Sequence, residues 1–184
     1  MENRASRRTD WTRRQEEFQK RLRQAQQFVS EPGSKVVNPN ECVYLLEAVI
    51  RPGDRVALEG NNQKQADFLA ECLCRVDVDR VNNLHMVQSV IALPSHCEVF
   101  ERGIARLADF SYSAPQSTRV ARMVEEGKMK IGEIHTYLEL FGRYFVDLTP
   151  DVALVTAIHA DRSGNLYTGP NTEDTPTIVE ATKF

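Results

Sequence analysis

Residues 55–69 read RVALEGNNQKQADFL, and this stretch decides the fold. The short apolar run around Val56 and Leu58 predicts a strand, and Gly60 ends it. Apolar positions at helical spacing follow the polar loop and predict a helix. A strand that feeds a helix through a polar turn is where α/β proteins bind ligands, because free N–H groups of the first helical turn face the crevice. One glycine makes neither a P-loop nor a Rossmann fingerprint, so this stretch alone favours a connecting turn.

The rest of the chain alternates candidate strands and helices. Apolar runs predict strands at residues 55–59, 84–93, 106–113 and 152–158, with short strands at 166–168 and 177–181. Helical patterns cover residues 39–50, 64–76, 95–102 and 115–127, with Ser95 as a cap, while 132–146 is ambiguous. The run at 152–158 is typical of a strand buried on both faces. This alternation predicts an α/β fold with a mostly parallel sheet flanked by helices.

The first 35 residues differ in charge from the remainder. They hold nine Lys or Arg against five Asp or Glu, in a chain whose net charge is −3. An apolar stripe predicts an amphipathic helix over about residues 10–29; it comprises Trp11, Phe18, Leu22, Ala25 and Val29. We expect the stripe to dock on the domain or on a partner subunit, with a membrane surface or RNA as the alternatives. The chain therefore divides into a basic amphipathic helix and linker at 1–35 and an α/β domain at 36–184.

Composition narrows the function classes. The slightly acidic balance gives no electrostatic case for nucleic acid. No run approaches the roughly 18 apolar residues of a membrane span, and the N-terminus lacks the apolar region of a secretory signal. The cysteines form no Cys-x-x-Cys pair, which predicts reduced thiols in a cytoplasmic protein and no metal site; they are Cys42, Cys72, Cys74 and Cys97.

Catalytic patterns are sparse. The four histidines are scattered; His159 and Asp161 resemble half of a metal site that no second pair completes. No serine occupies a Gly-x-Ser-x-Gly elbow. Three glutamates stand near predicted strand ends, where a carboxylate can act as a nucleophile in acyl transfer, but we expect each to be solvated or capping; they are Glu59, Glu133 and Glu180.

Several motifs resemble a known family. Residues 50–60, IRPGDRVALEG, and 151–166, DVALVTAIHADRSGNL, resemble the class I coenzyme A transferase fold. The segment 60–69, GNNQKQADFL, is more specifically similar to the alpha subunits of malonate decarboxylase, and residues 84–89 and 168–176 point the same way. The resemblance runs from about residue 10 to the end of the chain.

The resemblance implies a reaction and its partners. Alpha subunits of this family exchange acetate for malonate on the thiol of an acyl carrier protein, and other subunits then decarboxylate the malonyl thioester. The carrier holds a phosphoribosyl-dephospho-coenzyme A arm, so no cofactor is expected on this chain itself. In related coenzyme A transferases a glutamate attacks the thioester carbonyl and forms an acyl anhydride. Such a site needs N–H donors for the oxyanion and must exclude water.

The same resemblance implies a substrate pocket lined by five consecutive residues: Gly60, Asn61, Asn62, Gln63 and Lys64. Their amides would donate to malonate carboxylates or to the thioester oxygen, and the lysine would add charge against a dianion. Asp161, Gly164 and Asn165 are expected to shape a turn, since an Asp to Gly-Asn turn is structurally self-sufficient.

The catalytic glutamate of the family is expected outside this chain. In the family it lies in the second half of a much longer protein, whereas this sequence stops at Phe184. The sequence therefore predicts that this chain is the first half of a longer protein. Whether the chain is active by itself is left open by the sequence. Two alternatives remain: a non-catalytic module for assembly or for binding the carrier protein, and a coenzyme A transferase for another small carboxylate.

Overall fold

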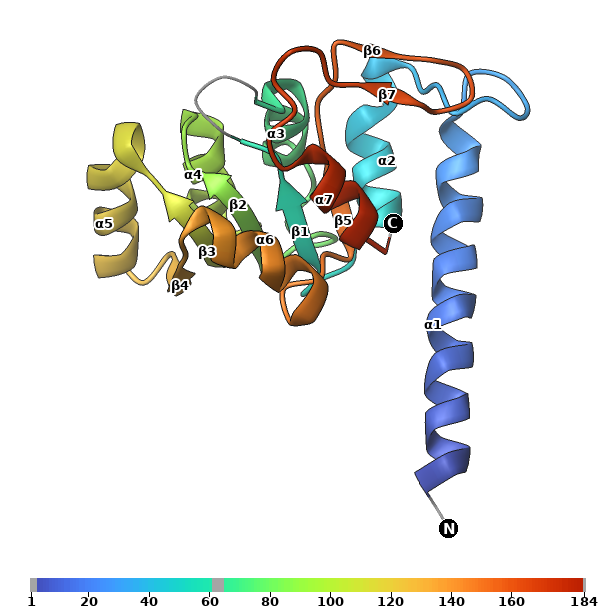
Figure 1. Ribbon diagram of the computed structural model, residues 1–184, viewed down its shortest axis with the longest axis horizontal. Helices are drawn as coiled ribbons and strands as arrows, with labels where there is room; N and C mark the ends of the chain where they lie inside the picture. The colour runs from blue at the N-terminus through green and yellow to red at the C-terminus, as the bar shows by residue number, and fades with distance from the viewer. Residues whose placement is uncertain (1–2, 61–64, 184) are drawn as a thin grey trace.

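A five-stranded sheet forms the centre of the computed structural model, which describes residues 3–60 and 65–183 (Figure 1). Its strand order is β4-β3-β2-β1-β5, and every pairing is parallel. The strands are β1 Arg55–Leu58, β2 Leu84–Val90, β3 Ala105–Tyr112, β4 Lys130–Ile134 and β5 Val152–Leu154. The prediction of an α/β fold with a mostly parallel sheet is confirmed.

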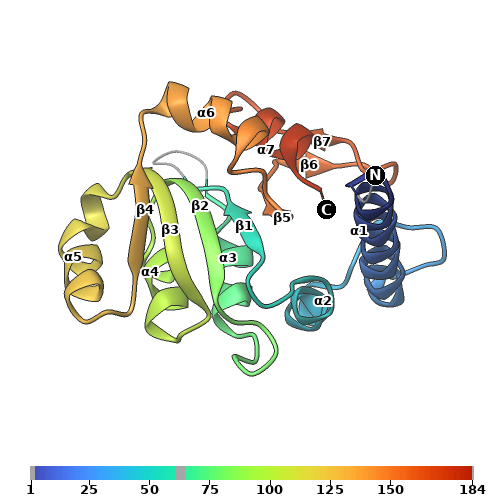
Figure 2. The ribbon, with the colours of Figure 1, turned by 90° about the horizontal axis from the view of Figure 1, so that it is seen from below.

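Helices cover both faces of this sheet (Figure 2). They are α1 Asn3–Ala25, α2 Cys42–Val49, α3 Asp67–Cys74, α4 Pro94–Glu101, α5 Ser117–Glu125, α6 Tyr137–Val146 and α7 Thr175–Ala181, with short 3-10 turns at Gln26–Phe28, Pro39–Glu41 and Ala114–Gln116. The larger core joins α2, α3, α4 and α5 to one face. Alternate residues of the strands, such as Ala57 and Val87, pack on α6 and α7 at the other face.

The strand order reverses beside β1. The chain passes from β1 to β4 in one direction across the sheet, and then returns over α6 to place β5 on the free side of β1. Ligands of open parallel sheets bind at such a switch point, outside the carboxyl ends of the strands. Here those ends are Leu58 and Leu154, where the N–H of Glu59 donates to the Leu154 carbonyl at 2.9 Å.

Strand β5 is shorter than the apolar run at 152–158 predicts. It ends at Leu154, and the chain then leaves the sheet for a separate antiparallel pair, β6 His159–Ala160 with β7 Leu166–Tyr167. The Asp161 carboxylate accepts the N–H groups of Ser163 and Asn165 within that hairpin, each at 2.9 Å. This turn is self-contained, as the sequence predicted.

Two local predictions are wrong. Residues 177–181 belong to helix α7 and not to a strand, because Pro176 in the first turn favours a helix start and the Ile178 carbonyl accepts the Thr182 N–H at 3.0 Å. Ser95 is not a cap, because α4 already begins at Pro94 after the N-cap residue Leu93. The ambiguous stretch 132–146 contains the end of β4 and the whole of α6.

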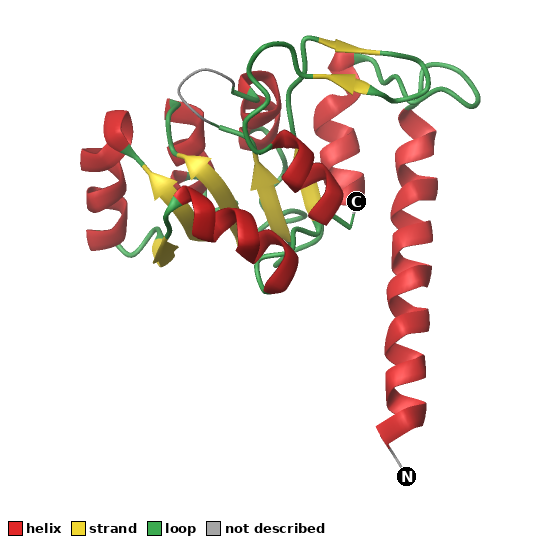
Figure 3. Ribbon diagram, viewed as in Figure 1, coloured by secondary structure: helices red, strands yellow, loops and turns green. Residues whose placement is uncertain are grey.

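Helix α1 lies beside α2, and its first half extends beyond the domain (Figures 1 and 3). The Arg21 guanidinium holds the Asp54 carboxylate through two bonds, at 2.6 and 3.1 Å. Arg51 joins the same helix by donating to Glu17 at 3.2 Å. None of the helices in the described part of the chain combines the length and apolar character needed to cross a membrane.

Candidate functional site

The polar loop that opened the sequence begins at the switch point. Gly60 follows β1 directly and forms an isolated bridge with Gln65, while the Ala66 N–H donates to the Glu59 carbonyl at 3.0 Å. The four other predicted pocket residues lie outside the described residues; they are Asn61, Asn62, Gln63 and Lys64. Both flanks of the loop therefore lie at the carboxyl end of β1 and the start of α3.

Gly60 is in close contact with α4. A Cβ atom at this position would lie 2.4 Å from Cε1 of His96 and 3.0 Å from the Val90 carbonyl oxygen. The Gly60 carbonyl in turn accepts the Val90 N–H at 2.9 Å. A glycine is thus required here for close approach of an imidazole ring.

His96 is a buried neutral imidazole. Its Nδ1 accepts the N–H groups of Ala92 at 3.2 Å and Leu93 at 3.5 Å, so the ring proton resides on Nε2. Burial lowers the pKa of His96 to about 4, while the Val90 carbonyl acts in the opposite direction. In the sequence, His96 was only one of four scattered histidines. Its contact with Gly60 could not be predicted, because that contact depends on how α4 packs.

The expectation for Glu59 was wrong, because this residue is neither solvated nor a helix cap. Glu59 is only 1% exposed. One carboxylate oxygen accepts the Thr156 N–H at 2.7 Å, and the other accepts the Thr175 hydroxyl. Glu59 therefore ties the end of β1 to the segment after β5 and to α7. The other two candidates behave as expected at the surface: Glu133 pairs with Arg143, and Glu180 is exposed.

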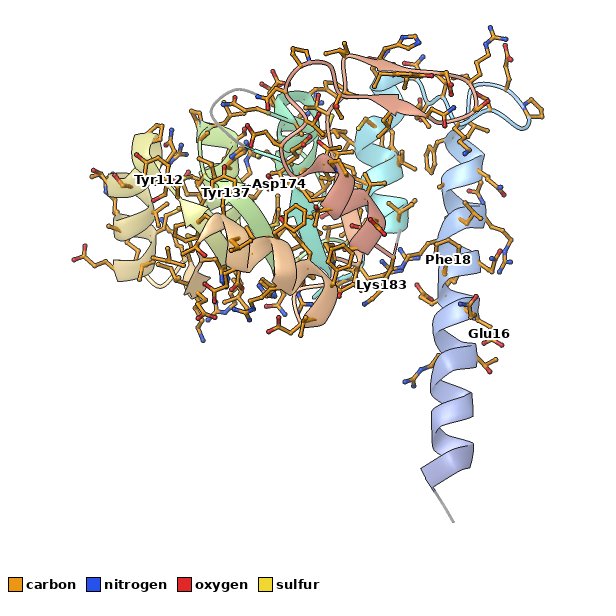
Figure 4. The ribbon with its side chains drawn as sticks, in the orientation of Figure 1. Glu16, Phe18, Tyr112, Tyr137, Asp174 and Lys183 are labelled. Atoms are coloured by element: carbon orange, nitrogen blue, oxygen red, sulfur yellow. The ribbon has the colours of Figure 1, made fainter. Side chains whose placement is uncertain are left out.

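A second carboxylate lies on the same face of the sheet. Asp174 precedes α7 and is labelled in Figure 4; it accepts the Ser89 hydroxyl, and both residues are buried. Tyr144 of α6 packs nearby, and its pKa is raised by burial and by the negative charges of Asp174 and Glu59. This face of the site thus presents acceptors, with each carboxylate already holding a hydroxyl.

A separate network lies farther along β3. The Asp109 carboxylate accepts Nε2–H of His85 at 2.5 Å and Nε2–H of His135 at 2.8 Å. Burial alone would raise the pKa of Asp109, but these two bonds lower it below its ordinary value. Asp109, Glu133 and His135 have ligand atoms within 4.8 Å of one another. Arg143 pairs with Glu133 and lies 3.4 Å from Nδ1 of His135, so a guanidinium already supplies positive charge there.

The other histidine suspected as a ligand has a structural setting. His159 lies on β6 with its ring 5.5 Å from that of Tyr167, and Asp161 is engaged in the turn described above. The four cysteines are free, as the sequence predicted, and all four are buried. Burial raises the pKa of the Cys42 thiol to about 12, which makes it a poor nucleophile at neutral pH.

Comparison with known proteins decides the family. A family model described as malonate decarboxylase, alpha subunit, transporter, matches residues 10–184. This chain belongs to the malonate decarboxylase alpha subunit family. A curated relative of the family, the acetyl-S-ACP:malonate ACP transferase of Malonomonas rubra, is 56% identical over 174 residues.

Two solved malonate decarboxylases share the fold. The alpha subunit from Acinetobacter baumannii is 45% identical, with a TM-score of 0.88 over 93% of this chain. A Pseudomonas malonate decarboxylase hetero-tetramer in complex with malonate is 51% identical, with a TM-score of 0.89 over 94% of the chain. The recognised resemblance to malonate decarboxylase alpha subunits is therefore confirmed.

The chain spans about a third of these malonate decarboxylase relatives. The alignment with the Malonomonas rubra protein covers 95% of this chain but only 31% of that protein. The alignments with the two solved chains likewise cover 31% of each of them. In the described residues, the site at the switch point offers a neutral donor under Gly60 on one face and hydroxyl-bound carboxylates on the other. Such an arrangement can bind and orient a substrate.

Proposed function

We propose that this chain contributes the substrate-binding part of an acetyl-S-ACP:malonate ACP transferase, which exchanges acetate for malonate on the thiol of an acyl carrier protein. The observation that carries the proposal is the 56% identity with the Malonomonas rubra transferase over 95% of this chain. The switch-point position of Gly60, where open parallel sheets bind ligands, supports it.

The proposed substrate pocket is the segment Gly60–Lys64. Amide donors from Asn61, Asn62 and Gln63 would hold a malonate carboxylate or the thioester oxygen, and Lys64 would balance the dianion. Gly60 has no space for a side chain, in keeping with a segment where a ligand and a backbone approach closely.

The nucleophilic carboxylate of the proposed transferase would come from outside this chain. Glu59 is the buried glutamate nearest in sequence to the pocket, but its two oxygens accept an N–H and a hydroxyl. A carboxylate stabilised by two such bonds is a weaker nucleophile, because attack must break them. Glu59 is better suited to holding the edge of the pocket.

The proposed partners follow from the same activity. The carrier protein would bring its phosphoribosyl-dephospho-coenzyme A arm, and the remaining subunits of a cytoplasmic malonate decarboxylase would complete the cycle. The Pseudomonas relative is a hetero-tetramer in complex with malonate, which supports a multisubunit assembly and this substrate.

A chimeric transferase tests the proposal. The region of the Malonomonas rubra transferase that matches this chain is replaced by residues 10–184, and acetate release from acetylated carrier protein is measured with malonate, citrate or acetoacetate. We expect malonate to be the preferred acceptor. Asn61→Ala or Asn62→Ala in the chimera should lower transfer about tenfold or more, because each removes a hydrogen bond to a charged group. An active chimera with unchanged malonate transfer in both variants contradicts the proposed pocket.

A further inference from the structure

Two side chains near the carboxyl ends of β1 and β2 hold buried polar atoms without partners among the described residues. Gln88 of β2 is 0% exposed, and neither its Nε2 nor its Oε1 has a hydrogen-bond partner among residues 3–60 and 65–183. Nε2 of His96, which is also 0% exposed, has none within the same described ranges. A buried amide without partners costs free energy of folding, so its presence calls for another role.

Gln88 and His96 lie on the same side of the sheet. Gln88 pairs in register with Phe110 of β3, which points into the core formed with α3 and α4. Since Ala57 pairs with Val87, Gln88 lies beside the last residue of β1, one position before Glu59. His96 comes from α4 and lies against Gly60, on the other flank of the same strand end.

Both side chains, Gln88 and His96, offer hydrogen-bond donors at this end of the sheet. His96 carries its proton on Nε2 because Nδ1 already accepts two backbone N–H groups. Gln88 offers two N–H groups of its own.

We propose that Gln88 and His96 bind one carboxylate of the substrate, by donation from Nε2–H₂ of Gln88 and Nε2–H of His96. This inference rests on the proposed function, since it assigns the carboxylate-reading groups of the same site. It differs from the Gly60–Lys64 pocket in its residues, which come from β2 and α4. The unpaired state of Gln88 is then the cost of a site kept ready for its ligand.

A pair of glutamine variants separates ligand binding from structure. Gln88→Met removes the unpaired amide at nearly constant volume. We expect its thermal midpoint to rise by about 2 to 6 °C, since a buried unsatisfied amide is replaced by an apolar group. Its affinity for sodium malonate, measured by calorimetry on the purified chain, should fall about tenfold or more. Gln116→Met is the matched control, because Nε2 of Gln116 already donates to the Ala92 carbonyl at 3.2 Å. That variant should lose stability and keep its malonate affinity.

A nuclear magnetic resonance titration reads His96 directly. The Nε2–H resonance of His96 should shift when malonate is added to the wild-type chain, and should not shift in Gln88→Met at the same concentration. Acetate should shift it too, with weaker affinity, because it carries one carboxylate.

Distinct outcomes overturn the inference and the proposed function. Unchanged malonate affinity in Gln88→Met, with the stability gain, means that the amide holds only a buried water and overturns the inference alone. A fall in stability in Gln88→Met overturns it as well, because the amide would then be structural. No malonate binding by the wild-type chain overturns the inference, whereas the proposed function falls only if the chimeric transferase also ignores malonate.

Discussion

At the scale of single residues, Gly60 and His96 are packed closely together. The ring of His96 occupies the space that a side chain at position 60 would need. Since His96 also fixes the turn before α4 through Nδ1, neither residue can shift without the other. Two predictions follow from this contact, one for each residue.

Gly60→Ala should destabilise the fold by about 1 to 3 kcal/mol, because the added methyl group would overpack against His96 and the Val90 carbonyl. Urea denaturation of the purified chain measures this change. Gly142→Ala is the control: Gly142 lies within α6 and its added Cβ meets nothing within 4 Å, so that variant should gain up to about 1 kcal/mol. Equal stabilities of the two variants would contradict the contact.

His96 should make stability depend on pH in the acid range. Its pKa is lowered to about 4 in the folded state, while an unfolded histidine titrates near its ordinary value of 6.5. Between these values the unfolded chain binds the proton and the folded chain does not, so stability falls as pH falls. His96→Asn should reduce the loss between pH 6.5 and 5 by about 2 kcal/mol in denaturation curves. His159→Asn, which alters an exposed histidine, should leave that loss unchanged.

Helix α7 shows how one buried carboxylate attaches a whole element. Its Thr175 hydroxyl donates to Glu59, and Asp174 just before it accepts the Ser89 hydroxyl. Ile178 adds apolar contact in the core beneath α6. The helix has seven residues, too few to be stable alone, so its order depends on these contacts.

Glu59→Gln should loosen α7 without unfolding the sheet. The amide still accepts the Thr156 N–H, but it must donate to the Thr175 hydroxyl instead of accepting from it, and the negative charge that strengthened both bonds is lost. We expect amide hydrogen exchange in α7 to become roughly tenfold faster, with exchange in α5 as the internal reference. The exposed change Glu180→Gln within α7 should have little effect. Unaltered protection of α7 in Glu59→Gln would show that the carboxylate does not hold the helix.

At the scale of the whole molecule, helix α1 packs on α2 and faces the outer side of β5 across a groove. An apolar groove of about 1010 Å³ runs between α1, α2 and β5, with Leu22, Leu46 and Leu154 among its lining. Phe18 and Lys183, both labelled in Figure 4, line a second cavity of about 410 Å³ beside the same strand. The ion pairs of Arg21 with Asp54 and of Arg51 with Glu17 also tie α1 to the domain.

Arg21→Gln should release α1 from the domain. The Arg21 and Asp54 side chains are only 12% and 9% exposed, and removal of one partner leaves a nearly buried charge unpaired. Hydrogen exchange over residues 12–25 should become about tenfold faster or more, while the sheet keeps its protection. Lys20→Gln, a change at an exposed neighbour, is the control. Equal exchange in the two variants would assign the attachment to apolar contacts.

The sequence by itself determined the order of most elements, the parallel sheet and the family. Apolar periodicity and turn residues are local signals, and they located four of the five strands of the sheet to within a few residues, whereas β4 overlaps the stretch 132–146 that they left ambiguous. They failed at residues 177–181, where β-branched side chains resembled a strand but Pro176 lies in the first turn of a helix. They also made β5 too long, because the point where a strand leaves the sheet depends on its neighbours.

Only the tertiary structure decided which polar residues matter at the site. Glu59 and Thr175 are 116 positions apart in the chain, and no local pattern indicates that α7 brings them together. The neutral state of His96 and the unpaired amide of Gln88 likewise arise from burial between β1, β2 and α4. Local sequence reports what each segment prefers, whereas desolvation and pairing of polar groups depend on segments that meet only in the folded chain.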